Sequence, residues 1–149
     1  IGALSAAELA LIEALFYADA SRYGFLGQKP LVQLTQAIDP RAIVKVPGSG
    51  HYLYAGRPRQ LFEEIARALG GQVILSSGVR GIVKQLRLFV AKALRHDGNL
   101  SLASRSLAPP GYSFHGTGDF DVGIPGWGER NFTADFADTA VFQRLIDLG

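Results

Sequence analysis

A histidine and two aspartates lie close together in the sequence, with glycines between them. His115 is followed by Asp119 and Asp121, and the intervening turn contains Gly116 and Gly118. Glycine allows the backbone to fold back closely between two side chains. An imidazole and a carboxylate are both good zinc donors, at bond lengths of about 2.0–2.2 Å. The pattern is compatible with a metal site, and also with a loop histidine bonded to a turn beside two solvated aspartates.

An arginine follows a predicted strand. Arg80 lies in the segment Ser77-Gly78-Val79-Arg80-Gly81, directly after the β-branched run 72–75. A guanidinium at the mouth of a site can pair with a carboxylate or with a developing oxyanion. The alternative interpretation is a strand-to-helix turn with an exposed arginine.

Together these two segments resemble one family of zinc peptidases. Its pattern, Ser-Gly-Tyr-Arg-Ser-x-x-x-Gln and then Pro-Gly-x-Ser-x-His-x-x-Gly-x-Ala-x-Asp, marks D-alanyl-D-alanine carboxypeptidases related to the vancomycin-resistance D,D-peptidases. Lysostaphin-type peptidases and the hedgehog signalling domain belong to the same group. The matching positions are Ser77, Gly78, Arg80 and Gln85 in the first motif and Pro110, Gly111, Ser113, His115 and Gly118 in the second. Val79 and Gly81 replace the Tyr and Ser of the first motif, and the resemblance covers roughly residues 52–149.

The resemblance implies a zinc site. It makes His115 the first ligand and Asp121 the second. The family aspartate follows the histidine by seven residues, a position that Val122 occupies here, so the turn has lost one residue. Because residues two apart in a strand share a side, Asp119 remains an alternative ligand.

The resemblance also implies substrate contacts. Arg80 corresponds to the family arginine that steadies the scissile carbonyl or the substrate carboxylate, and Gln85 and Ser113 correspond to substrate-binding positions. The two other histidines, His51 and His96, match nothing in the pattern and are interpreted as ordinary loop or surface residues.

One family motif has no counterpart in these residues. The family carries Glu-x-Trp-His, which supplies the general base and the third zinc ligand. The single tryptophan here is Trp127, and no histidine follows His115. We therefore expect either a sequence cut before that motif or a non-catalytic relative. Glu129 could replace the base, although a loop glutamate is the simpler interpretation.

The elements around these residues indicate an α+β fold, with a small, mainly antiparallel sheet that carries the zinc site and is flanked by helices. Ser5 and Glu8 form a capping box pattern that begins a helix running to about Ala20. The other predicted elements are helices at 58–69 and 82–95, a last helix capped by Thr133, and strands at 72–75 and 120–124. Residues 1–50 form a loop-rich lead-in, in which a short helix at 31–38 is possible.

Composition bounds the remaining possibilities. A length of 149 residues corresponds to about one domain, so we expect a single domain over 1–149. The absence of cysteine excludes thiolate ligands, and any zinc must use His, Asp or Glu. The net charge of +2 is small and its basic residues are scattered, which argues against a nucleic-acid partner. The opening stretch is too short and too polar to span a bilayer.

The resemblance thus implies zinc-dependent hydrolysis of D-alanyl peptide bonds in bacterial peptidoglycan, with a stem peptide ending in D-Ala as the partner. Because peptidoglycan lies outside the cytoplasm, we expect a periplasmic or secreted location. The alternatives are a peptidoglycan endopeptidase of the same family and a non-catalytic module that binds zinc or cell wall.

Overall fold

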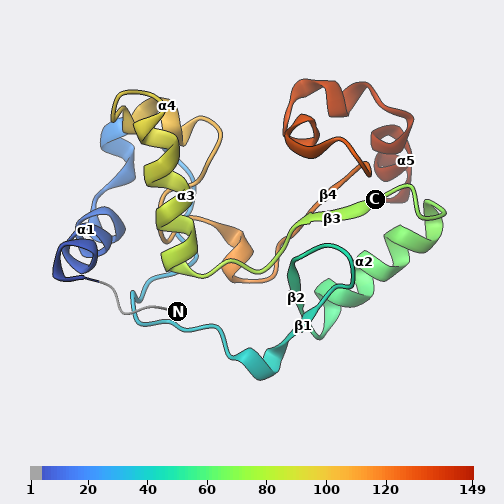
Figure 1. The fold of residues 1–149 in the computed structure, drawn as a ribbon, viewed down its shortest axis with the longest axis horizontal. Helices are drawn as coiled ribbons and strands as arrows, with labels where there is room; N and C mark the ends of the chain where they lie inside the picture. Colours follow the sequence, from blue (N-terminus) through green and yellow to red (C-terminus); the bar gives the residue numbers. More distant parts are fainter. Residues whose placement is uncertain (1–4) are drawn as a thin grey trace. The chain divides into compact units, whose positions relative to one another are not determined.

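The protein is described here by a computed structural model, which covers residues 5–149 and divides into two compact units. The first unit contains residues up to Ile38 together with Arg80–Thr117, and the second contains Asp39–Val79 and Gly118–Gly149. The chain therefore passes between the units three times (Figure 1). That all 149 residues form one domain stays a prediction. Within residues 5–149, no helix has the length and apolar character needed to cross a membrane.

The first unit is helical. Its α-helices are α1 (Ala6–Tyr17), α3 (Ile82–Leu94) and α4 (Leu100–Ser104), and short 3-10 turns lie at Ala20–Tyr23 and Phe114–Gly116. The capping box is confirmed: Glu8 N donates to Ser5 Oγ at 3.2 Å, and Ser5 N donates to the Glu8 carboxylate at 2.8 Å. These bonds satisfy backbone donors that the first helical turn would otherwise leave unpaired. α1 ends at Tyr17, three residues before the predicted end.

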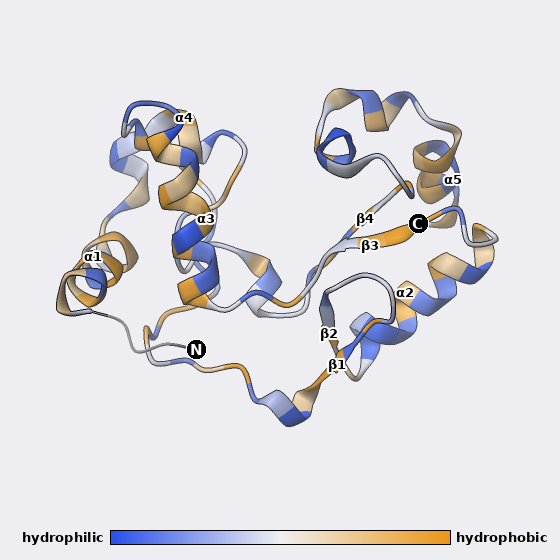
Figure 2. Cartoon of the chain, viewed as in Figure 1, coloured by the Kyte–Doolittle hydropathy of each residue, from blue (hydrophilic) through white to orange (hydrophobic). Residues whose placement is uncertain are grey.

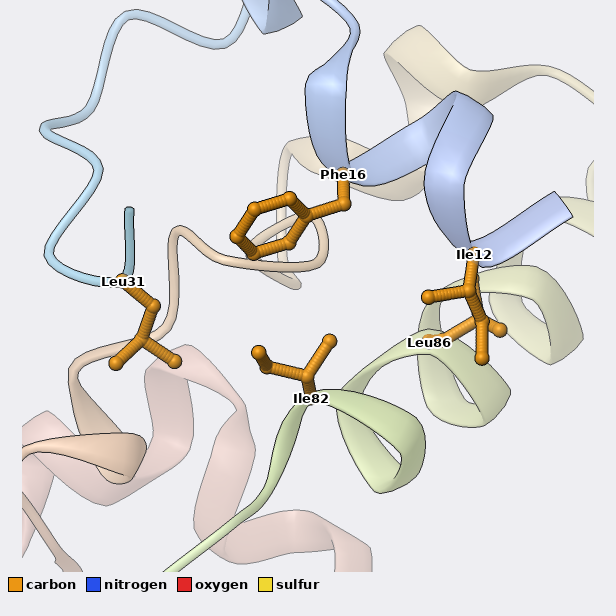
Figure 3. Close-up of a cluster of buried hydrophobic side chains, with 5 residues drawn as sticks. All are labelled: Ile12, Phe16, Leu31, Ile82 and Leu86. Carbon is orange, nitrogen blue, oxygen red and sulfur yellow. The ribbon is translucent and has the colours of Figure 1, made fainter. Parts of the chain in front are cut away.

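The core of the first unit contains two apolar clusters. One joins α1 to α3 through the side chains drawn in Figure 3: Ile12, Phe16, Leu31, Ile82 and Leu86. The other consists of Phe89, Ala93 and Ala103. Leu31 belongs to the first cluster, but the helix expected at 31–38 is wrong. This segment is irregular, with a single turn in which Gln36 N donates to Gln33 O, because one buried leucine does not make a helical face.

The second unit carries two small antiparallel sheets. β1 (Ile43–Lys45) pairs with β2 (Tyr52–Tyr54), and β3 (Ile74–Ser77) pairs with β4 (Asp121–Gly123). Its α-helices are α2 (Arg57–Ala68) and α5 (Ala140–Leu148). Polar and apolar segments alternate along α2 (Figure 2), as expected for a helix with one face on a core. The α+β class and the antiparallel strands are confirmed.

Two details of the second unit differ from expectation. The last helix begins at Ala140 and not after Thr133, because residues 134–138 form a 3-10 turn and Thr139 Oγ1 caps the helix by accepting from Phe142 N. The hairpin β1–β2 was not predicted, since its strands are three residues long and flank a Pro/Gly turn. The apolar cluster of this unit contains Leu69, Val73 and Val141.

Candidate active site

The parts of the two motifs that carry Arg80 and His115 meet within the first unit. Arg80 N donates to His115 O at 3.1 Å, so the turn that carries the arginine is bonded directly to the turn that carries the histidine. The histidine turn is closed by a 2.8 Å bond from Thr117 N to Phe114 O. Segments far apart in sequence are thus held side by side by their backbones, independently of the side chains that would perform chemistry.

A buried glutamine orients the arginine. Arg80 Nη1 donates to Gln85 Oε1 at 3.0 Å, and Gln85 Nε2 donates to Ala108 O. Gln85 is 2% exposed, so its carboxamide lies inside the protein and is bonded at both ends. Because a planar guanidinium is directional, this relay fixes the angle at which Arg80 is presented. The role of Gln85 as a substrate contact stays a prediction.

The histidine loop has little space around it. Ser113 is buried, and its carbonyl accepts from Gly116 N at 3.4 Å. A Cβ on Gly116 would lie 2.9 Å from Leu31 Cδ1 and 3.4 Å from Arg80 O. Glycine is required there because Leu31 and Arg80 approach it from two sides. His115 itself is half-buried.

The predicted carboxylate ligands lie in the second unit. Asp121 is half-buried at the first position of β4, where it pairs with Ser77 across an irregularity in the strand register. Asp119 is exposed and precedes the strand. The argument that strand alternation puts both aspartates on one side therefore does not hold, because Asp119 is outside β4.

The second unit also contains residues near the motifs that the sequence did not single out. Val79 N donates to Tyr52 O at 2.8 Å, and a Cβ on Gly78 would overlap that same carbonyl oxygen. The hairpin β1–β2 therefore supports the segment leading into Arg80 and explains the glycine of the first motif. Tyr54, on the same hairpin, lies beside Gly118, and burial raises the pKa of its phenol. Tyr52 and Tyr54 carried no recognisable sequence signal.

The donor chemistry of the predicted residues fits zinc. His115 offers an imidazole and Asp121 a carboxylate oxygen, and neither is sequestered in an apolar core. Among residues 5–149, no cluster of three or more His, Asp or Glu side chains is arranged to hold a metal ion. That His115 and Asp121 are zinc ligands stays a prediction.

Comparison with known proteins places the chain in a family. The family model VanY, described as D-alanyl-D-alanine carboxypeptidase, matches residues 54–148, which is more than half of the chain. No curated protein matches the sequence.

Solved structures share the fold. One is the vancomycin-resistance D,D-pentapeptidase VanY from a VanB-type cassette, a Glu-to-Ala mutant in complex with Zn(II): TM-score 0.52, 19% identity, covering 74% of this chain and 65% of that one. Another is VanYB in complex with D-alanine-D-alanine: TM-score 0.54, 18% identity, covering 80% and 70%. This chain therefore spans about two thirds of the length of these structures. The family match and the shared fold confirm the resemblance read from the two motifs: the chain belongs to the D-alanyl-D-alanine carboxypeptidase family.

Proposed function

We propose that this protein acts on D-alanyl peptide bonds of peptidoglycan as a zinc-dependent D,D-carboxypeptidase. The observation that carries the proposal is the bond between Arg80 N and His115 O, which links the segment of the first motif to the segment of the second. The family match and the relatives that bind Zn(II) and D-alanine-D-alanine support the same reaction.

In this proposal His115 and Asp121 hold the zinc. Asp121 is favoured over Asp119 because it is half-buried and fixed by strand pairing, whereas Asp119 is exposed outside the strand. When bound, zinc polarises the peptide carbonyl and lowers the pKa of a water molecule to about 7. The imidazole must be neutral to serve as a ligand, so metal affinity should fall at acidic pH.

Arg80 binds the charge of the substrate. Its guanidinium would pair with the C-terminal carboxylate of the stem peptide or with the oxyanion that develops on the scissile carbonyl. Gln85 acts behind it as a positioning residue, because its carboxamide is anchored on Ala108 O and receives an Arg80 N–H. Ser113 would complete the substrate contacts from the histidine loop.

The partner is a peptidoglycan stem peptide ending in D-Ala, and the location that this requires is the periplasm or the cell exterior. A non-catalytic module is the second candidate, favoured because residues 5–149 hold no group of three or more His, Asp or Glu side chains that could bind a metal ion. The two functions differ in turnover and not in metal binding, so they can be separated by experiment.

The first test is zinc titration by calorimetry. The 149-residue chain should bind zinc weakly, His115→Ala and Asp121→Asn should abolish the heat, and Asp119→Asn should leave it nearly unchanged. Unchanged zinc binding in His115→Ala would remove the metal site from this loop. Equal losses in the two aspartate variants would reopen the choice of carboxylate.

The second test concerns the ligand. With zinc present, N-acyl-D-Ala-D-Ala should bind and N-acyl-L-Ala-L-Ala should not. We expect little release of D-alanine by residues 1–149, since they contain no Glu-x-Trp-His segment, and release from a chain that carries one after residue 149. If that longer chain binds zinc but releases no D-alanine, the non-catalytic function is supported. Binding of the L,L-peptide with equal affinity would contradict both.

A further inference from the structure

A lysine of the lead-in lies within an aromatic cage at the end of α1. Lys29 Nζ lies 3.9 Å from the Phe16 ring centroid, 5.6 Å from that of Tyr17 and 5.5 Å from that of Tyr112. It also donates to Phe16 O. Phe16 O belongs to the last turn of α1, where carbonyls have no intrahelical partner and a cation is favourable. The helix has no basic residue of its own in that turn.

The same lysine packs against the second family motif. A Cβ on Gly111 would lie 2.9 Å from Lys29 Cε and 2.7 Å from Phe16 Cε2, and Gly111 has a φ of +87°. Only glycine adopts this backbone conformation readily, and only glycine leaves room for the lysine stem. The glycine of the Pro-Gly motif is thus explained by a residue of the lead-in. Burial lowers the pKa of the Lys29 ammonium.

Leu31 continues the contact along the loop. Leu31 N donates to Gly111 O at 3.2 Å, and Leu31 Cδ1 lies at the crowded side of Gly116, next to His115. Its side chain is 5% exposed and belongs to the apolar cluster of α1 and α3 (Figure 3). The Lys29–Leu31 segment therefore contacts the motif at Gly111 and at Gly116, and Ser113 and His115 lie between these two contacts.

We propose that the Lys29–Leu31 segment positions the loop that carries Ser113 and His115, with Lys29 as its principal positioning residue. The segment lies outside residues 54–148, which the family model matches. In this proposal Lys29 holds the loop against the end of α1, and Leu31 holds it against the apolar cluster of α1 and α3. The inference rests on the proposed function for the role of His115.

Hydrogen exchange of the zinc-free chain tests the positioning directly. Lys29→Met removes the ammonium and keeps the length of the stem, and amides 112–117 should then exchange about tenfold faster, as for loss of one charge-assisted hydrogen bond. Lys84→Met is the matched control, since Lys84 is exposed on α3 in the same unit, and it should leave these amides unchanged. Unchanged exchange in Lys29→Met would overturn the proposal.

Zinc affinity separates positioning from simple stabilisation. Lys29→Met should weaken zinc binding about tenfold, the usual scale for residues that orient ligands. Phe89→Leu, which loosens the other apolar cluster of the unit, should lower thermal stability and leave zinc affinity unchanged. Equal weakening in both variants would show that affinity follows stability alone and would overturn the proposal. If the unaltered chain binds no zinc, the metal site of the proposed function fails, and hydrogen exchange still decides the role of Lys29.

Discussion

The two units hold their predicted functional residues by different means. In the first unit, Arg80 and the His115 loop are held by helix cores, a buried carboxamide and a backbone bond between loops. In the second, Asp121 is placed by strand register against Ser77. The position of a strand residue is fixed by the hydrogen bonds between paired strands. A loop residue has no such regular bonds, so its position depends on several separate contacts. The comparison predicts that the stability of the first unit depends mainly on the packing of buried side chains. In the second unit we expect stability to depend on the close approach of backbone segments, as at Gly78 and Tyr52.

The largest expected effect is on the core of the first unit. Phe89 is fully buried, and Phe89→Ala should lower the free energy of unfolding by about 3–5 kcal/mol. Urea denaturation would measure the loss, and hydrogen exchange should show it first in α3 and α4. Phe132→Ala is the control in the second unit, since that ring is 57% exposed and its removal should cost less than about 0.5 kcal/mol. A small loss in Phe89→Ala would mean that packing does not hold this unit.

The next effect concerns ligand binding by the first unit. Arg80→Ala should weaken zinc-dependent binding of N-acyl-D-Ala-D-Ala by about ten- to a hundredfold, because a hydrogen bond to a charged group contributes about 1.5–3 kcal/mol. Arg80→Lys should restore part of the affinity, since an ammonium lacks the planar fork. Gln85→Met should give an intermediate loss if the carboxamide orients Arg80. Calorimetry on the zinc-loaded chain measures all three, and full affinity in Arg80→Ala would exclude the arginine from the site.

The close approach of backbone segments in the second unit can be tested at Gly78. Gly78→Ala should destabilise the protein by about 1–3 kcal/mol, because the new methyl group meets the Tyr52 carbonyl in the β1–β2 hairpin. Gly81→Ser provides the contrast in the first unit. A Cβ there makes an ordinary 3.5 Å contact with Ile38, and serine is a good N-cap for α3, so stability should be unchanged or slightly higher. Equal melting temperatures for Gly78→Ala and Gly81→Ser would show that a Cβ at Gly78 is no more harmful than one at Gly81.

The smallest effect is a pH dependence in the first unit. Burial, with smaller contributions from Tyr112 and Asp19, raises the pKa of Tyr23 to about 12 from 10.0. The folded protein therefore keeps a proton on Tyr23 that the unfolded chain loses above about pH 10. Because loss of this proton favours the unfolded chain, the free energy of unfolding decreases as the pH rises from about 10 toward 12. The Tyr23 hydroxyl is buried and lacks a hydrogen-bond partner within residues 5–149, so Tyr23→Phe should be neutral or stabilising by up to about 1 kcal/mol. The melting temperature of Tyr23→Phe should decrease less between pH 9 and 11 than that of the unaltered chain. An identical decrease in both would contradict a raised pKa for Tyr23.

The sequence predicted the parts of the fold that local signals control. The Ser5 capping box, the apolar spacing of α3 and the helix α2 each depend on residues a few positions apart, and all three were found. The hairpin β1–β2 was missed because three-residue strands show too little alternation to be recognised. Thr133 and Thr139 both precede helix-like segments, and sequence does not distinguish the threonine that begins a 3-10 turn from the one that caps α5.

The motif residues could be identified from the sequence, but the contacts that support them could not. Arg80, Gln85, Ser113 and His115 were identified by motif, and the structure brings their segments together in one unit. Their assigned roles, and that of Asp121, stay predictions. The supports from Lys29, Leu31 and Tyr52 could not be inferred, because each contacts a motif that is distant in sequence and has no pattern of its own. Long-range contacts of this kind leave no local periodicity.

The three passages of the chain between units have a practical consequence. The match to the family model begins at residue 54, yet the first unit needs residues before Ile38 to cover Ile82 and Leu86. A fragment that begins at residue 54 would therefore expose the apolar side of α3 and would lack both Lys29 and the end of α1 that it contacts. For this protein, the range that the family model matches is therefore shorter than the stretch of chain that builds the core of the first unit.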